Sequence, residues 1–233
     1  MKVAVVLPTY NEKENAGVII PEIFRVLPEC TVFVVDDNSP DGTAAFTESL
    51  KTKFPNLRLV KRQNKEGLGK AYIYAFKEIL KNFNFDIFIT MDADLSHSPK
   101  YLPEIIAKAE TNDVVVGSRY VKGGQTVGWE LWRRILSFGG NFYCKMILGM
   151  PVFDATAGFI AIKTDFIKKV DFEKFDLSGY AFLIELKYTL YKLGAKFFEV
   201  PIVFKNRIGG ESKISNHIIS EGVLAPWKML FKK

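Results

Sequence analysis

The sequence predicts an α/β fold whose central sheet is mostly parallel and is flanked by helices. Short apolar runs with the length of buried strands alternate with segments of helical periodicity along the first half of the chain. Such alternation is typical of a parallel sheet that has helices on both faces. The chain of 233 residues has the size of one domain, or of one domain with a C-terminal extension.

The expected strands are apolar runs that end in polar or turn residues. In chain order they are Val3–Pro8, Val32–Asp36, Leu57–Val60, Ile87–Met91, Val114–Gly117, Ile160–Ile162 and Lys196–Phe204. The expected helices carry apolar residues at helical spacing, and one further short helix follows the turn Asp37–Gly42. Those with defined bounds are Asn15–Val26, Leu68–Asn82, Lys100–Ala109, Trp129–Met150 and Tyr180–Leu193. In sheets of this kind, ligands bind beyond the carboxyl ends of the strands.

The composition restricts the classes of partner and the compartment. Hydrophobic residues make up 48% of the chain, enough for a large core, and the net charge of +6 suits phosphate-bearing partners. Cys30 and Cys144 form neither a disulfide framework nor a spaced metal site, which favours a reducing, cytoplasmic setting. The N-terminal run is too short for a signal peptide, and no stretch reaches the roughly 18–20 apolar residues that span a bilayer. Any membrane contact is therefore expected to be peripheral.

A pair of carboxylates follows the expected strand Ile87–Met91. Asp92 and Asp94 lie one residue apart at its end. Carboxylate oxygens bind Mg²⁺ or Mn²⁺, and such an ion neutralises a leaving diphosphate. Alternatively, the two aspartates only precede a helix that begins at Ser98 and Pro99.

A second acidic pair, Asp36 and Asp37, ends the second expected strand. Asp36 suits a contact to a nucleotide base or ribose. Alternatively, the pair serves the turn that follows, because Asn38–Gly42 has the composition of a tight turn. A binding loop also needs a turn, so both roles are compatible.

Four motifs occur in order and at compatible spacings: Pro8–Glu12, Val35–Thr43, Gly67–Ala71 and Met91–Pro99. In these motifs the chain resembles the inverting glycosyltransferase family 2, and within it the dolichol-phosphate mannosyltransferases. The resemblance extends from the first strand to about Ser215. It implies a GT-A fold over residues 1–215, followed by an amphipathic tail over residues 216–233.

The resemblance also implies a role for each residue that matches a family motif. The implied nucleotide-binding residues are Pro8, Tyr10, Glu12, Asp36, Asp92, Arg207 and Lys213. The implied ligands of Mg²⁺ or Mn²⁺ are Asp92, Asp94 and Ser96, with Ser96 binding directly or through a water. The implied catalytic residues are Asp94, Arg119, Arg207 and Lys213. The last two lie in the loop Asn206–Ser215, which is expected to close on the diphosphate or, alternatively, to be an ordinary basic surface loop.

Residues 129–150 are expected to form a basic amphipathic helix. Its apolar stripe is Leu131, Ile135, Phe138, Phe142 and Met146, and its polar stripe is Arg133, Ser137, Asn141 and Lys145. The helix is expected to lie at a membrane interface or, alternatively, to pack on the core. Arg119, after the strand Val114–Gly117, suits a phosphate clamp or, alternatively, is an exposed arginine at a strand end. The resemblance favours the clamp and implies that Arg119, Arg133 and Ser137 bind the acceptor phosphate. The tail is expected to be a second interfacial segment, a docking helix or a frayed end.

The resemblance implies transfer of mannose from GDP-mannose to dolichyl or another polyprenyl phosphate, with inversion. The alternatives are UDP-glucose as donor and a hydroxyl group as acceptor. A phosphate acceptor needs no general base, so Glu185 is expected to be structural or to contact sugar hydroxyls. Asp154 is expected to face the sugar, to brace the acceptor loop or, alternatively, to serve a turn. The expected location is the cytoplasmic face of a membrane, with a membrane-anchoring partner protein as a further hypothesis, and no nucleic-acid partner is expected.

Overall fold

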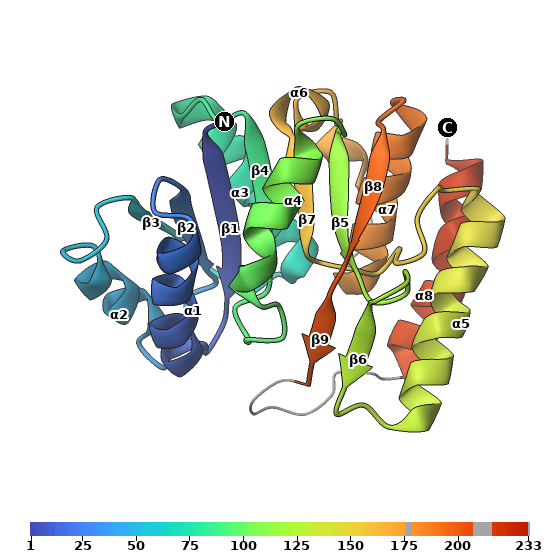
Figure 1. Ribbon diagram of the computed structural model, residues 1–233, viewed down its shortest axis with the longest axis horizontal. Coiled ribbons are helices and arrows are strands. Elements are labelled where there is room, and N and C mark those ends of the chain that lie inside the picture. The colour runs from blue at the N-terminus through green and yellow to red at the C-terminus, as the bar shows by residue number, and fades with distance from the viewer. Residues whose placement is uncertain (176–178, 207–215, 233) are drawn as a thin grey trace.

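The computed structural model describes residues 1–175, 179–206 and 216–232, and the side chains of 1–175, 181–206 and 223–232. Within these residues, a seven-stranded sheet has the order β3-β2-β1-β4-β7-β5-β8 (Figure 1). Its strands are β1 (Val3–Thr9), β2 (Thr31–Asp36), β3 (Leu57–Lys61), β4 (Ile87–Thr90), β5 (Val114–Ser118), β7 (Ile160–Lys163) and β8 (Phe197–Pro201). Only β7 runs antiparallel to its neighbours among these strands, so the prediction of a mostly parallel sheet is confirmed.

Helices cover both faces of the sheet. They are α1 (Lys13–Val26), α2 (Thr43–Leu50), α3 (Leu68–Asn82), α4 (Leu102–Ala109), α5 (Leu131–Leu148), α6 (Thr164–Ile167), α7 (Gly179–Lys192) and α8 (Asn216–Phe231), with 3-10 turns at Pro99–Tyr101 and Phe172–Lys174. In Figure 1, α1 and α4 lie in front of the sheet, and α3 and α7 lie behind it. Each layer buries its own apolar cluster against the strands, so the sheet is covered on both faces.

The glycine motif that begins α3 has a packing role. A Cβ atom at Gly69 would lie 2.8 Å from the ring of Phe182 on α7. Only glycine therefore allows α3 to approach α7 this closely, behind the sheet. Leu68–Asn82 matches its predicted bounds.

One expected strand is divided. Residues Lys196–Phe204 form β8, which pairs with β5, and then β9 (Val203–Lys205), which pairs with β6 (Gln125–Val127) in a small separate sheet. The division occurs at Ile202, whose N–H donates to Ser118 O at 2.9 Å, at the end of β5. Because β5 ends at Ser118, the residues after Ile202 pair with β6 instead.

The C-terminal helix α8 packs beside α5 (Figure 1). Trp227 Nε1 donates to Tyr143 Oη at 2.7 Å, and Tyr143 Oη donates to Val223 O at 3.0 Å. The tail is therefore a docked helix rather than a frayed end. Over the described part of the chain, no helix combines the length and the apolar character needed to cross a membrane.

Candidate active site

The parallel strands β1, β2, β4 and β5 end at one edge of the sheet, which is the lower edge in Figure 1. The polar segments predicted to carry the site follow these ends, as the sequence predicts. Strands β6 and β9 lie beyond the same edge. The candidate residues from the first half of the chain thus lie at one end of the fold.

The segment after β1 is held by the turn after β2. The backbone N–H groups of Asn11, Glu12 and Lys13 donate to side chains of that turn, at 3.0, 3.1 and 3.0 Å. The acceptors are Ser39, Thr43 and Asp41. Asn11 has a φ of 60°, a left-handed conformation that costs free energy in most residues. The predicted nucleotide-contacting loop is therefore fixed in place by its neighbour.

Asp36 serves this turn directly. Its Oδ1 accepts from Thr9 Oγ1 at 3.0 Å, and its Oδ2 accepts from the Ser39 N–H at 2.9 Å. The neighbouring Asp37 forms a buried ion pair with Arg62 at 2.5 Å. The alternative of turn chemistry thus describes what Asp36 does here, and its contact to a nucleotide stays a prediction.

Tyr10 offers a flat apolar face next to these groups. The Nζ atom of Lys65 lies 3.8 Å from its ring centroid. Glu12 is partly buried, and its carboxylate accepts from Asn15 Nδ2 at 2.6 Å. Pro8 is also partly exposed, so all three matched residues of this loop have accessible surface.

Asp92 and Asp94 follow β4, with the left-handed residue Leu95 (φ 64°) directly after them. Asp94 is buried, and its Oδ1 accepts from the Ser96 hydroxyl at 2.5 Å and from the Ser96 N–H at 3.1 Å. The Asp92 side chain is more open, with 25% of its surface exposed. Ser96 therefore orients the carboxylate of Asp94, and Leu95, which lies between these two residues, adopts the left-handed conformation that this contact requires.

His97 supports the same segment, although the sequence analysis gave it no role. The Asp92 N–H donates to His97 Nδ1 at 3.0 Å, and the ring stacks on Phe159 at 5.2 Å between centroids. Burial lowers the pKa of His97 although Asp92 and Asp94 act in the opposite direction. A neutral imidazole that accepts at Nδ1 fits both observations. Its position within the Met91–Pro99 motif was the available signal.

The carboxylate pair fits a divalent cation that is completed by a substrate. Asp92 and Asp94 both raise the pKa of the buried Tyr72 hydroxyl, after the larger effect of burial itself, so negative charge gathers here. Among the described side chains, no group of three or more acidic, histidine or cysteine residues forms a ready metal cage. Two carboxylates with a neighbouring hydroxyl instead suit Mg²⁺ or Mn²⁺, which keep ligand positions for phosphate oxygens and water.

Arg119 is buried against Asp154, which the sequence did not pair with it. Its Nε donates to Asp154 Oδ2 at 2.8 Å, its Nη2 donates to Asp154 Oδ1 at 2.6 Å, and Nη2 also donates to Thr156 Oγ1 at 2.7 Å. Burial alone would raise the pKa of Asp154, but the charge and hydrogen bonds of Arg119 outweigh it and hold that pKa below its ordinary value. Arg119 is 8% exposed, so the alternative of an exposed arginine at a strand end is wrong, and its binding of a phosphate stays a prediction.

The three predicted acceptor residues lie together. The guanidinium carbons of Arg119 and Arg133 lie 5.5 and 4.1 Å from the centroid of Trp129. Ser137 Oγ accepts from Tyr120 Oη at 2.6 Å, and Tyr120 follows Arg119 directly. The structure thus brings the segment after β5 together with α5, and the binding of an acceptor phosphate by these residues stays a prediction.

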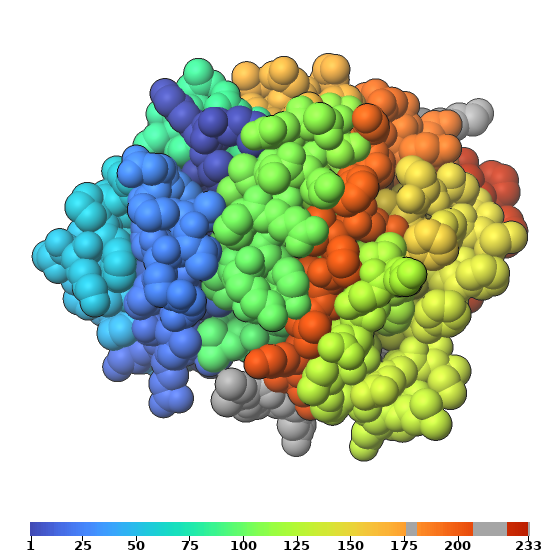
Figure 2. Space-filling model, viewed as in Figure 1, coloured from blue at the N-terminus to red at the C-terminus, as the bar shows by residue number. Residues whose placement is uncertain are grey.

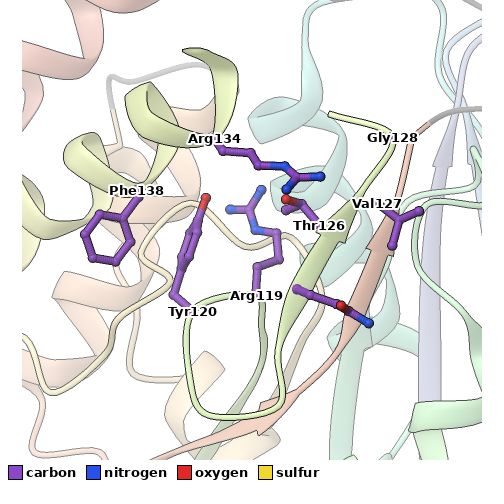
Figure 3. A pocket seen from close by; sticks show the side chains of 8 residues that line it. Arg119, Tyr120, Thr126, Val127, Gly128, Arg134 and Phe138 are labelled. Atoms are coloured by element: carbon purple, nitrogen blue, oxygen red, sulfur yellow. The ribbon is translucent and has the colours of Figure 1, made fainter. Parts of the chain in front are cut away.

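A cavity of about 490 Å³ opens beside them. Figure 3 shows Arg119 and Arg134 with their guanidinium groups directed toward the same space, and Tyr120 between Arg119 and Phe138. Arg134, the neighbour of Arg133 on α5, is not among the predicted acceptor residues. Arg134 lines the cavity together with Thr126 of β6, so the cavity forms only where α5 and β6 meet. The cavity combines two cations with an aromatic wall.

The amphipathic helix α5 has its polar stripe toward the protein. Asn141 is 1% exposed and exchanges hydrogen bonds with Thr156 at 3.0 and 3.1 Å. The predicted apolar stripe faces outward, with Leu131 at 71% and Met146 at 66% exposure. The apolar stripe therefore does not pack on the core, although α5 itself does so through Cys144 and Leu148, and its place at a membrane interface stays a prediction. In Figure 2, residues of α5 form one edge of the molecular face that is shown.

Glu185 does not face the cavity described above. Its carboxylate accepts from Lys232 Nζ at 2.6 Å, which joins α7 to the end of α8. We expect Glu185→Gln to keep the wild-type kcat and to lower the free energy of unfolding by about 1–3 kcal/mol, as for a lost bond to a charged group. Lys232→Met is the matched variant and should reproduce the stability change. Steady-state kinetics and urea unfolding check both, and a large fall in kcat for Glu185→Gln alone would make it a catalytic base instead.

Comparison with known proteins decides the family. The family description "Glycosyl transferase family 2" matches residues 4–171. The chain belongs to glycosyltransferase family 2. An undecaprenyl-phosphate mannosyltransferase of Micrococcus luteus is 38% identical over 96% of this chain and 92% of the relative. A polyprenol monophosphomannose synthase of Mycolicibacterium smegmatis is 37% identical over 96% and 85%.

Two further comparisons concern length and fold. A dolichol-phosphate mannosyltransferase of Pyrococcus furiosus is 34% identical over 95% of this chain, which spans 61% of that relative. The solved glucosyl-3-phosphoglycerate synthase of Mycobacterium tuberculosis, bound to Mn²⁺ and UDP, gives a TM-score of 0.70 at 19% identity over 97% of this chain and 78% of its own. A mannosyltransferase of Pyrobaculum calidifontis with GDP-Man and Mn²⁺ gives 0.70 at 16% identity, over 100% and 64%. The GT-A fold of this glycosyltransferase is thereby confirmed.

Two predicted residues are not part of this description. Arg207 and Lys213, the expected diphosphate contacts, lie outside the described residues. Their roles stay predictions, as do those of Pro8, Tyr10 and Glu12.

Proposed function

We propose that this glycosyltransferase transfers mannose from GDP-mannose to a polyprenyl phosphate such as dolichyl phosphate. The observation that carries the proposal is the agreement of three relatives, each 34–38% identical over at least 95% of this chain, that are named as polyprenyl-phosphate mannosyltransferases. The likeness to a solved mannosyltransferase with GDP-Man supports the donor by fold alone. The cationic cavity beside Arg119 suits a phosphate acceptor.

The donor is proposed to bind across the carboxyl ends of β1, β2 and β4. Tyr10, Glu12 and Asp36 would contact the nucleoside, and Arg207 and Lys213 would contact the diphosphate. Asp92 and Asp94, with Ser96 directly or through a water, would hold Mg²⁺ or Mn²⁺. When bound, such an ion supplies positive charge to the departing diphosphate. Ser96 keeps Asp94 oriented, through the 2.5 Å bond to its Oδ1.

The proposed reaction is one in-line displacement with inversion. An oxygen of the lipid phosphate forms a bond to the anomeric carbon, and the bond from that carbon to the GDP oxygen breaks. The attacking oxygen is already ionised near neutral pH, so the chain need not supply a base. The contributions of Arg119, Arg133 and Ser137 are then to bind and orient the acceptor phosphate, with Arg134 added by its place in the cavity.

The acceptor is proposed to arrive from a membrane along α5 and α8, with the protein peripheral on the cytoplasmic face. Large apolar side chains are exposed on both helices, including Ile135, Phe142, Trp227 and Phe231. An outward apolar stripe beside arginines is the arrangement that interfacial helices use. The lipid phosphate would then lie at the depth of the cavity while its chain stays in the bilayer.

This surface gives a direct prediction. We expect Ile135→Glu/Phe142→Glu to weaken binding to acidic liposomes by at least about tenfold, because two large apolar contacts of roughly 1.5–3 kcal/mol each are replaced by charges. Val18→Glu on α1, also an exposed apolar position, is the matched control and should bind as the wild type does. Flotation with phosphatidylserine vesicles measures the effect. Wild-type protein that floats only with an added membrane protein would favour the anchoring partner over the bare bilayer.

A panel of donors and acceptors tests the reaction. GDP-mannose and UDP-glucose are each offered with dolichyl phosphate, undecaprenyl phosphate and a soluble sugar. We expect mannosyl lipid from GDP-mannose with either lipid, and a product of opposite anomeric configuration to the donor. Glucosyl lipid from UDP-glucose alone would replace the donor, and glycosylated sugar without lipid product would overturn the acceptor.

A further inference from the structure

Lys187 on α7 is a fully buried lysine to which the sequence analysis gave no role. Its side chain is 0% exposed, and its Nζ donates to Ala157 O at 2.6 Å, to Ala155 O at 2.9 Å and to Leu183 O at 3.4 Å. A buried ammonium is costly unless it is hydrogen-bonded, and its donors here all meet backbone carbonyl groups. Core packing alone therefore does not account for a lysine at this position.

Two of those carbonyls belong to the loop that holds Arg119. Asp154 and Thr156 bond the guanidinium of Arg119 through their side chains, whereas the alternate residues Ala155 and Ala157 present their carbonyls to Lys187. Arg119 thus bonds side chains of this loop, and Lys187 bonds backbone carbonyl groups of the same loop.

The loop is fixed from two further elements. Glu199 on β8 accepts from the N–H groups of Phe153 and Asp154, at 2.8 and 3.1 Å. Asn141 on α5 accepts from the Thr156 N–H at 3.0 Å. Of the charged groups in this arrangement, Lys187 is the cation that approaches the loop from the side of α7. Removing its amino group would leave the buried carbonyls without this donor, which costs free energy and lets the loop shift.

We propose that Lys187 is a positioning residue for the acceptor site: it fixes the loop Phe153–Ala157 so that Asp154 and Thr156 hold Arg119 in the orientation that binds the acceptor phosphate. The inference rests on the proposed function, since it assigns Arg119 to the acceptor. It predicts an effect on acceptor binding with no matching effect on the donor, which binds at the ends of other strands.

Lys187 loses its charge near neutral pH, well below the range in which lysine ordinarily does so. Burial lowers its pKa from 10.5 to about 7; Asp154, Glu199 and Cys144 act to raise it, and Arg119 acts to lower it. The neutral amine has two N–H donors for three carbonyls. The KM for acceptor is therefore expected to rise as pH increases from 7 to 9.

Stability changes with the opposite sign. Because the folded pKa of about 7 is below the ordinary 10.5, the unfolded chain binds more protons between these values, and this group's contribution to folding grows as pH rises. If Lys187 had only a structural role, the free energy of unfolding would increase at high pH while the KM for acceptor stayed unchanged. Weaker acceptor binding together with greater stability at high pH is the signature of the positioning role.

Lys187→Met tests this with the full chain. We expect the KM for dolichyl phosphate to rise about 10–100-fold, the size of effect seen when a group that orients a ligand is removed, while the KM for GDP-mannose stays at the wild-type value. The pH dependence of acceptor KM between 7 and 9, relative to wild type, should disappear. Lys187→Gln, which still donates two N–H bonds, should recover part of the loss. Lys192→Met, an exposed lysine on the same helix, is the matched control and should match wild type.

The outcomes separate two failures. A wild type that makes no mannosyl lipid overturns the proposed function, whereas an active wild type with unchanged acceptor KM in Lys187→Met overturns only the positioning role. If Lys187→Met does not fold, Thr156→Ala and Lys187→Gln form a double-mutant cycle. We expect their effects on acceptor KM to be non-additive, because both act through one loop. Additive effects, or equal changes in donor and acceptor KM, would contradict the proposal.

Discussion

Replacing Asp94 with Asn is expected to abolish measurable sugar transfer and to leave the fold intact. The change removes one carboxylate charge after β4 and keeps the size of the side chain, whose remaining oxygen can still accept from Ser96. Because a proposed direct metal ligand is lost, the fall in kcat/KM should exceed the roughly 10–100-fold effect of losing a group that only orients a ligand. Transfer at saturating Mn²⁺, with the thermal unfolding temperature measured in parallel, checks this.

Ser96→Ala is the graded companion to that variant. It removes the hydroxyl that donates to Asp94 Oδ1, so we expect a fall of about 10–100-fold and a higher Mn²⁺ concentration for half-maximal rate. An Asp94→Asn enzyme with wild-type kcat/KM would contradict the metal role of this pair. A Ser96→Ala enzyme as inactive as Asp94→Asn would instead make Ser96 a ligand of equal weight.

Asp154→Ala is expected to give the largest loss of stability, about 3–5 kcal/mol, because it leaves Arg119 buried without its carboxylate partner. Asp154 is fully buried, and its carboxylate accepts from the Arg119 backbone N–H at 2.9 Å as well as from its guanidinium. Urea unfolding followed by circular dichroism measures the difference.

A second substitution separates stability from catalysis. Arg119→Met/Asp154→Leu replaces the buried pair with apolar groups, so we expect most of the lost stability to return while transfer stays abolished. Asp154→Ala protein as stable as wild type would show that Arg119 finds another partner. Recovered transfer in the double variant would remove Arg119 from the acceptor site.

The helices, the strands and the edge of the sheet proposed for the donor were predictable because they depend on local pattern. Val3–Pro8 and Leu68–Asn82 form a strand and a helix close to their expected bounds, since apolar periodicity reports which face is buried. The position of Asp92 and Asp94 beyond the carboxyl end of β4 was predictable from the strand pattern, whereas their binding of a metal stays a prediction. The alternation of strands and helices along the chain therefore predicted that these carboxylates lie at one edge of the sheet.

The proposed acceptor half of the site depends on contacts between segments that are distant in the sequence. Arg119 and Asp154 are 35 residues apart, and neither strand periodicity nor spacing indicates which carboxylate an arginine will meet. Lys187 lies between Leu186 and Tyr188 in the sequence of α7, and nothing in that local pattern indicates that it donates to a loop 30 residues away. The antiparallel strand β7, inserted between β4 and β5, creates these contacts, and local sequence does not encode its place in the sheet.

Transfer of radiolabelled mannose from GDP-mannose to dolichyl phosphate, with Mn²⁺ and again with EDTA, tests the proposed reaction most directly. We expect labelled lipid with Mn²⁺ and none with EDTA. Labelled lipid in equal amounts under both conditions would contradict the role given to Asp92 and Asp94. Folded, Mn²⁺-supplied protein that forms no labelled lipid would contradict mannosyl transfer to polyprenyl phosphate itself.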